Sequence, residues 1–293
     1  MPDDAYAVAR DAAEAEAAFS HPAVTPDATA AYGEHPDQVV DFYEPRTATE
    51  NPAPFVVVLH GGAWRAPYDR QHLTPFADFL ARRGFAVASV EYRRGSSIPA
   101  QGGDGPVAGR WPETFDDIAA AFDALPALAA ELLPTADLRR TVVTGHSAGG
   151  HLALWAAARH VLPTGSPWRL DRPAPFRGVV ALAPIADFRV AQELGVCSGA
   201  ALQLLGGDAH FEERLPHADP AALLPTGIAT TVVQGRTDIV VPQAVAEAYA
   251  DAAAKAGEVV GVTLLEEVGH FPLIDPAADA CAVVAEEIAQ LAF

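Results

Sequence analysis

Short, uninterrupted apolar runs that alternate with helical patterns limit what this chain can fold into more than any other feature. The clearest run is Phe55-Val56-Val57-Val58-Leu59. Such runs are typical of strands buried on both faces, as in a parallel sheet covered by helices. Strands are expected at residues 39–43, 55–60, 85–92, 141–145, 178–183, 230–234 and 262–265, and helices at 72–83, 113–132, 148–161, 243–256 and 276–291. The pattern predicts an α/β fold with a mostly parallel central sheet and helices on both faces.

The organisation along the 293 residues predicts one domain over 1–293. No internal repeat or low-complexity linker divides the chain. Residues 1–30 begin with an alanine-rich, acidic segment over 3–19, which predicts an N-terminal helical extension. Stretches 94–112, 163–177 and 186–228 do not fit the strand-helix alternation, and long connections after strands commonly form a small cap or rim over a site.

Charge and composition exclude several classes of function. The formal net charge is −19, which argues against nucleic-acid binding because a phosphate backbone requires a basic surface. Lys255 is the only lysine, so neither a P-loop nor a pyridoxal Schiff base is expected. Two separated cysteines suggest no disulfide framework or thiolate metal site. Without a secretory signal or a membrane-length apolar run, the sequence predicts a cytoplasmic protein that does not bind membranes.

The strongest chemical signal is Gly145-His146-Ser147-Ala148-Gly149, a G-x-S-x-G motif. It directly follows the strand expected at 141–145 and precedes a helical run. This is the context of a nucleophile elbow, in which a strained turn lifts the serine hydroxyl above the edge of the sheet. The same turn directs the backbone N–H of Ala148 toward a developing oxyanion. We therefore predict Ser147 as the nucleophile, whereas a simple glycine-rich turn is the alternative interpretation.

A second glycine motif follows an earlier strand. His60-Gly61-Gly62-Ala63-Trp64 comes directly after the apolar run that ends at Leu59. Glycines in such a loop let backbone amides approach a substrate, so we expect the N–H groups of Gly62 and Ala63 to complete an oxyanion hole with Ala148. We also expect Trp64 to contact the substrate. Taken alone, the motif fits a tight turn equally well.

A serine nucleophile needs a histidine base and a carboxylate that orients it. With a nucleophile elbow, the expected order along the chain is serine, acid and then histidine. His270 follows the last expected strand, and Asp238 follows the strand before it. The other histidines after Ser147 lie on the following helix or in the expected rim: His151, His160, His210 and His217. The rival acids are more simply explained as turn or helix caps: Asp208, Asp219 and, before the last helix, Asp275.

No metal site is expected. His146 and His151 are five residues apart, which is not the i, i+4 spacing of a helical zinc pair, and the sequence has no HExxH motif. We interpret His151 as a side chain that packs or hydrogen-bonds beneath the site.

These motifs together resemble those of the α/β-hydrolase serine esterases, and within them the arylformamidase (kynurenine formamidase) group. The resemblance rests on the HGGxW pattern at residues 60–64, on residues 145–151, on Asp238 with Val240-Val241-Pro242, and on His270-Phe271. It extends from about residue 32, at Tyr32-Gly33-Glu34-His35-Pro36-Asp37-Gln38, to the C-terminus. General esterases share HGGxW, whereas the hormone-sensitive-lipase-like esterases usually have HGGG.

The resemblance implies an α/β-hydrolase fold and hydrolysis of N-formyl-L-kynurenine to kynurenine and formate, without a metal or an organic cofactor. By this similarity Ser147 attacks the formyl carbon, His270 takes the serine proton, and the amides of Gly62, Ala63 and Ala148 hold the oxyanion. The expected partner is a small-molecule acyl substrate, and a homodimer is left open. Two alternatives remain: a carboxylesterase for short-chain or aryl esters with the same triad, and a non-catalytic binding protein on a hydrolase scaffold.

Overall fold

A central eight-stranded sheet organises the protein, as a computed structural model that describes residues 2–47, 51–95 and 107–293 shows. The strand order is β1-β2-β4-β3-β5-β6-β7-β8. Strands β3 to β8 run parallel to one another, whereas β2 is antiparallel to both of its neighbours, β1 and β4. The strands span Ala28–Ala31 (β1), Val39–Tyr43 (β2), Ala53–Leu59 (β3), Ala86–Val90 (β4), Ala136–His146 (β5), Gly178–Leu182 (β6), Thr230–Gly235 (β7) and Gly261–Leu265 (β8).

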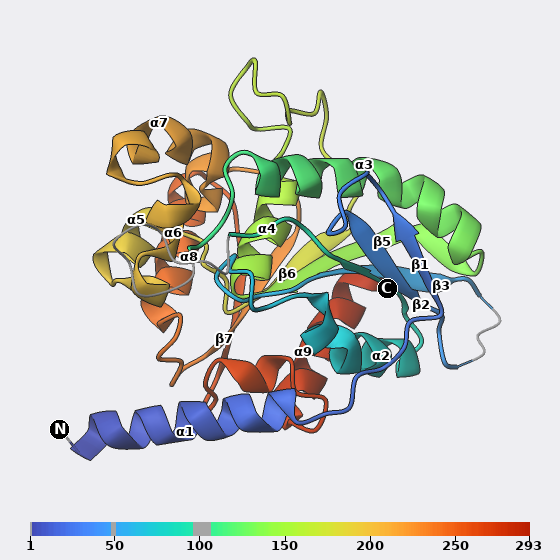
Figure 1. The fold of residues 1–293 in the computed structure, drawn as a ribbon, viewed down its shortest axis with the longest axis horizontal. Coiled ribbons are helices and arrows are strands. Elements are labelled where there is room, and N and C mark those ends of the chain that lie inside the picture. The colour runs from blue at the N-terminus through green and yellow to red at the C-terminus, as the bar shows by residue number, and fades with distance from the viewer. Residues whose placement is uncertain (1, 48–50, 96–106) are drawn as a thin grey trace.

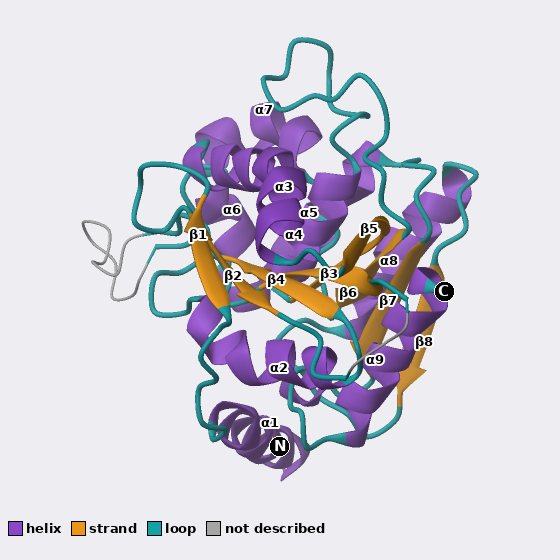
Figure 2. Cartoon of the chain, turned by 90° about the vertical axis from the view of Figure 1, so that its right-hand side faces the viewer, coloured by secondary structure: helices purple, strands orange, loops and turns teal. Residues whose placement is uncertain are grey.

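Helices cover both faces of this sheet (Figure 2). On one face lie α3 (Glu113–Leu132), α4 (Ala148–Ala157) and α8 (Gln243–Lys255). On the other lie α2 (Thr74–Arg82) and α9 (Asp279–Ala292), and α1 (Pro2–Phe19) lies on the same side, farther from the sheet. Alternate residues of β3 contribute to two separate cores, Val57 to one and Val56 to the other. The prediction of a doubly covered, mostly parallel sheet is thus confirmed, and the fold is that of an α/β hydrolase.

The connection between β6 and β7 forms a small helical cap. It contains α5 (Phe188–Glu193), α6 (Ala200–Leu204) and α7 (Asp208–Ala218), with short 3₁₀ turns at Val196–Ser198 and Pro220–Leu223. Figure 1 shows these elements grouped beside α8. Residues 163–177 form a loop with neither helix nor strand. Of the stretch 94–112, residues 96–106 lie outside the described part of the chain.

Several boundaries differ from the sequence-based expectation. β1 (Ala28–Ala31) was not expected, because alanine is a weak strand former and this edge strand alternates half-buried and exposed residues. β5 begins at Ala136, five residues before the expected start. The sequence did not reveal these five residues because most of them are half-buried and they form no apolar run. α9 begins at Asp279, so Asp275 is not its N-cap. Asp275 instead accepts a hydrogen bond from the backbone N–H of Ala277 and meets the ring of His21.

The described residues include no helix that is both long and apolar enough to span a bilayer.

Candidate active site

Ser147 stands in the turn between β5 and α4, as the elbow motif predicts. Its backbone is at φ 57° and ψ −117°, a left-handed conformation that costs free energy for a residue with a side chain. A Cβ at Gly145 would come within 2.3 Å of the Gly149 carbonyl oxygen, and one at Gly149 within 2.1 Å of the Leu59 carbonyl oxygen. The two flanking glycines therefore allow the end of β5 to approach the first turn of α4, and that turn to approach the end of β3. The hydrogen bond from Ser147 N–H to the Leu182 carbonyl, 2.8 Å, anchors it.

Asp238 and His270 are brought together at the ends of β7 and β8. His270 Nδ1 lies 2.6 Å from Asp238 Oδ2, and both side chains are buried. The other carboxylate oxygen, Oδ1, accepts hydrogen bonds of 2.8 Å from the N–H groups of Val240 and Val241. A carboxylate fixed in this way selects the tautomer in which Nδ1 carries the proton and Nε2 is free to act as a base.

His146 is a site residue whose role the sequence reasoning missed. Its ring lies beside that of His270 with a centroid distance of 4.3 Å, and its Nε2–H donates to the His270 carbonyl oxygen at 3.0 Å. Burial, reinforced by the nearby His270, holds the pKa of His146 well below its usual range, so this ring is neutral. The residue before the nucleophile thus ties the elbow to the backbone of His270. The only signal in the sequence was a histidine at the second position of G-x-S-x-G.

The loop after β3, residues 60–65, carries two of the amides that the sequence analysis expects in an oxyanion hole, and we call it the oxyanion loop for this expected role. Gly62 and Ala63 have φ values of 107° and 51°, and within the described ranges no hydrogen bond uses either N–H. Ala148 is the first residue of α4, so no carbonyl of the helix can accept a hydrogen bond from its N–H. The three predicted donors therefore lie on the two loops that flank Ser147, with N–H groups available for a ligand.

A buried network beneath this loop holds it in place. His60 Nε2 meets Glu91 Oε1 at 2.8 Å, and the His60 ring stacks on Tyr92 with a centroid distance of 4.2 Å. Tyr92 Oη donates to the His60 carbonyl at 2.7 Å, and the Arg70 N–H donates to Glu91 at 3.0 Å. The sequence analysis assigned no role to Glu91 or Tyr92, because residues at the end of β4 become neighbours of β3 only through strand pairing.

Ser147 and His270 face a cavity of about 190 Å³, which we call the catalytic cavity. It is bounded by the elbow, the oxyanion loop, the cap and the end of α1. Its lining residues are Phe19, Gly62, Ala63, Arg65, Tyr68, His72, His146, Ser147, Cys197, Ser198, Val240, His270 and Phe271.

Trp64 does not line this cavity, which corrects its predicted role as a substrate contact. Its side chain is fully buried and packs edge-on against His151, with a centroid distance of 5.0 Å, and against Phe188. Trp64 has a positive φ of 55°, and its indole packs in the core whereas Gly62 and Ala63 before it line the cavity. Trp64 therefore supports the oxyanion loop from below.

The cap contributes to the catalytic cavity through Cys197 and Ser198, which sequence reasoning did not single out. Burial raises the pKa of the Cys197 thiol to about 11, so this lining group is uncharged at physiological pH. Its carbonyl accepts a hydrogen bond of 2.7 Å from Arg65, which links the cap to the oxyanion loop.

The rival residues lie elsewhere. His151 is buried beneath the elbow, where its Nε2–H donates to the Ala218 carbonyl at 2.9 Å, as the sequence interpretation expected. Asp219 begins a 3₁₀ turn and accepts hydrogen bonds from the N–H groups of Phe188 and Ala221. The remaining candidates are also absent from the lining of the catalytic cavity: His160, His210, His217 and Asp208.

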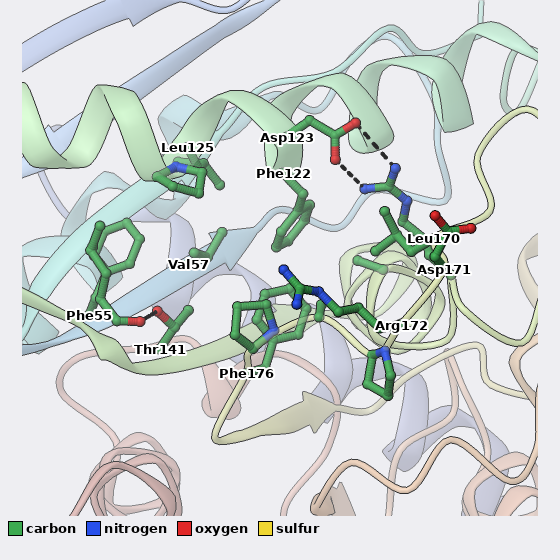
Figure 3. A pocket seen from close by; sticks show the side chains of 17 residues that line it. Phe55, Val57, Phe122, Asp123, Leu125, Thr141, Leu170, Asp171, Arg172 and Phe176 are labelled. Carbon is green, nitrogen blue, oxygen red and sulfur yellow. Dashed lines mark hydrogen bonds and ion pairs between the residues drawn. The ribbon is translucent and has the colours of Figure 1, made fainter.

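A larger cavity of about 490 Å³ lies near the amino ends of the central strands β3 and β5, and we call it the apolar cavity (Figure 3). It is formed by the early parts of β3 and β5, by α3 and by the loop at 170–176. Figure 3 shows the carboxylate of Asp123 turned toward a guanidinium group. Its partner is Arg159, whose Nη1 donates to Asp123 Oδ1 at 2.8 Å. Its lining includes neither Ser147 nor any other predicted site residue.

A family model described as BD-FAE matches residues 40–252, which is most of the chain and includes Ser147 and Asp238. The chain belongs to the BD-FAE family. Its match ends before His270, so the family comparison itself does not place the histidine. A search of curated proteins gives no match.

Several solved structures share the fold of this BD-FAE family member. Esterase B from Lactobacillus rhamnosis aligns with a TM-score of 0.73 at 19% identity, over 100% of this chain and 97% of that one. A truncated carbohydrate esterase from gut microbiota aligns with a TM-score of 0.71 at 19% identity, over 92% and 97%. The butyrate-bound Est2 esterase of Thermogutta terrifontis aligns with a TM-score of 0.62 at 20% identity, over 90% and 92%.

Proposed function

We propose that this protein is a serine carboxylesterase that cleaves esters of short acyl groups through Ser147, His270 and Asp238. The observation that carries the proposal is the buried 2.6 Å contact between His270 and Asp238 at the wall of a cavity that Ser147 also lines. Nucleophile, base and orienting carboxylate are the three groups that acyl transfer requires. Membership of the BD-FAE family and the esterases among the similar folds support the same class of reaction.

The reaction follows from the positions of these groups. Ser147 Oγ attacks the ester carbonyl carbon while His270 Nε2 takes its proton, and the carbonyl oxygen becomes an oxyanion held by the amides of Gly62, Ala63 and Ala148. His270 then gives the proton to the departing alcohol, which leaves an acyl-serine. Water attacks this acyl-enzyme with His270 again as the base, and the acid is released as the serine regains its proton.

The size of the catalytic cavity favours a short acyl group. Its volume of about 190 Å³ must accept the acyl chain and part of the alcohol, and Tyr68, His72 and Phe271 narrow it. The similar Est2 structure contains butyrate, which is a short acyl group. The resemblance of the motifs to arylformamidases makes N-formyl-L-kynurenine a second candidate substrate, since a formyl group also fits a small cavity.

One experiment separates these candidates. Hydrolysis of p-nitrophenyl acetate, butyrate and octanoate is measured beside N-formyl-L-kynurenine, with Ser147→Ala as the test variant and Ser198→Ala as the matched control. Ser198 provides a second hydroxyl in the same cavity without the elbow geometry. We expect kcat/KM to be highest for acetate or butyrate, to be lost in Ser147→Ala and to persist in Ser198→Ala.

Three outcomes would change the proposal. Turnover of the formamide above both short esters would assign the formamidase activity instead. A preference for octanoate would contradict the short-acyl preference. Wild-type turnover no higher than that of Ser147→Ala, together with failure of a fluorophosphonate to label the wild-type serine, would favour a non-catalytic binding protein on this scaffold.

A further inference from the structure

The N-terminal helix α1 contacts both loops that provide the acid and the base. Figure 1 shows α1 lying along the segment that follows β8. Glu14 Oε1 accepts a hydrogen bond of 3.2 Å from the N–H of Gly269, the residue before His270. One turn earlier on the same helix, Arg10 donates to the carbonyl of Thr237, the residue before Asp238. Two side chains of one helix thus bind the backbone next to both partners of the His270–Asp238 pair.

The covered face of α1 combines charged side chains with the small side chains of alanines. The large apolar side chains Tyr6 and Val8 point into solvent, with 72% and 60% of their surfaces exposed. The face turned toward the protein carries Arg10, Asp11 and Glu14, at the spacing of neighbours on one side of a helix. No large apolar side chain is buried along this part of the helix, so the hydrogen bonds to the two loops are the specific interactions of its first three turns.

Gly269 is shaped to receive Glu14. A Cβ at position 269 would lie 1.9 Å from Glu14 Oε2, so only glycine lets the carboxylate approach the backbone here. Burial raises the pKa of Glu14, against the stabilising effects of the Gly269 N–H and of Arg10. Partial burial of the charged Glu14 carboxylate costs free energy of desolvation, a cost that a fully exposed carboxylate on the helix would not have.

The end of the helix reaches the catalytic cavity itself. Phe19 lines the cavity, and its ring meets that of Phe271, the residue after His270, edge-on with a centroid distance of 5.3 Å. The same ring also packs against His72, another residue that lines the cavity, with a centroid distance of 5.6 Å. α1 therefore contacts the chain on both sides of His270, at Gly269 through Glu14 and at Phe271 through Phe19.

We propose that α1 is part of the active site and that Glu14 is a positioning residue, which holds the backbone of His270 so that its imidazole faces Ser147. The inference rests on the proposed esterase function. Glu14 touches no reacting atom, and it acts through Gly269. Loss of its hydrogen bond is expected to affect the chemical step, because a displaced base is costly even when substrate binding is intact.

The test uses the full chain with Glu14→Ala, Glu14→Gln and, as matched control, Glu16→Ala. Glu16 is an exposed carboxylate on the same helix. We expect Glu14→Ala to lower kcat for p-nitrophenyl acetate about tenfold with KM changed by less than about twofold. Glu14→Gln is expected to recover most of the lost kcat, because its amide oxygen can still accept from Gly269. Glu16→Ala is expected to match the wild type.

A double-mutant cycle with Gly269→Ala sharpens the test. The added methyl group would displace the Glu14 carboxylate, so Gly269→Ala is expected to lose kcat to a similar extent, and the double variant with Glu14→Ala to lose no more than either single variant. Unchanged kcat in Glu14→Ala, an equal loss in Glu14→Gln, or losses that simply multiply would each overturn the inference. Ser147→Ala measured in parallel makes the two failures distinguishable. Turnover that is lost in Ser147→Ala but unchanged in Glu14→Ala overturns only the role of Glu14, whereas turnover retained in Ser147→Ala overturns the esterase function.

Discussion

The catalytic cavity and the apolar cavity differ in a way that volume does not predict. The apolar cavity is more than twice as large, about 490 against 190 Å³, yet three polar side chains in its wall already have partners within the protein. Asp123 pairs with Arg159, and the Thr141 hydroxyl donates to the Leu138 carbonyl at 2.6 Å. The catalytic cavity instead presents a serine, an oriented histidine and two amides that donate no hydrogen bond in the described parts of the chain. Unsatisfied and oriented polar groups mark the site better than size does.

Backbone strain separates the same two regions. Four residues that line the catalytic cavity have a positive φ without being glycine: Ala63, Ser147, Cys197 and Ser198. None of the residues that line the apolar cavity has this conformation. Such strain persists only where the surrounding structure imposes it, and it is concentrated here where the backbone must present groups to a ligand. The comparison predicts that changes to the triad and to the amides of the oxyanion loop alter turnover, whereas changes at the apolar cavity alter stability.

The largest expected effect is that of Asp238→Asn. The amide can still accept from Val240 and Val241, so the fold should persist, but its NH₂ group favours the wrong tautomer of His270. We expect kcat for p-nitrophenyl acetate to fall by about 10⁴-fold, with an unchanged circular dichroism spectrum. Thr141→Val is the control at the apolar cavity and should keep kcat within about twofold. A loss of only a few-fold in Asp238→Asn would remove Asp238 from its assigned role.

Gly62→Ala should have the next largest effect. The φ of 107° disfavours any side chain, and the new Cβ would lie 2.3 Å from that of Tyr68, so the Gly62 and Ala63 amides must move. The loss of an oxyanion donor typically lowers kcat by about 10²-fold. Gly165→Ala is a matched control, since Gly165 has a φ of 92° but open space around it. If both variants lose kcat equally, strain rather than the oxyanion hole explains the result.

Arg159→Leu should weaken the fold without affecting turnover. Arg159 is buried, and besides Asp123 its guanidinium satisfies the Trp168 carbonyl at 2.9 Å. Leaving that carbonyl without a donor should lower the free energy of unfolding by about 2 kcal/mol. Urea denaturation measures this loss, and kcat/KM should stay within about twofold of wild type. A large loss of kcat/KM in the folded variant would couple the two cavities and break the distinction between them.

The smallest expected effect is a pH dependence of stability that arises from buried histidines, such as His151 beneath the elbow. Burial lowers the pKa of His151 to about 3, so between that pH and about 6.5 the unfolded chain binds a proton that the folded protein does not. Acidification through this range should therefore lower the free energy of unfolding, by up to about 1.4 kcal/mol per pH unit for each such histidine. Urea denaturation at pH 7.5, 6.5 and 5.5 measures the slope. His151→Gln should reduce it, and an unchanged slope would contradict this assignment.

Local signals were enough for most of the framework. Seven of the strands, the elbow and the order of serine, acid and histidine follow from apolar runs and from the residues that directly follow them. These features depend on residues that are adjacent in the sequence, so the sequence alone is enough to predict them. β1 and the cap helices did not give such signals, because their short and half-exposed segments become regular only against the rest of the protein.

By itself, then, the sequence determined the α/β sheet, the elbow serine and the candidates for its acid and base. Tertiary structure alone decided that Trp64 turns into the core, that His146 holds the backbone of His270, and that α1 lies against the loops of Asp238 and His270. The physical reason is that these are contacts between segments up to 255 residues apart. The strand order and the packing of the helices determine which of these segments meet, whereas local sequence patterns determine only where each helix or strand begins and ends.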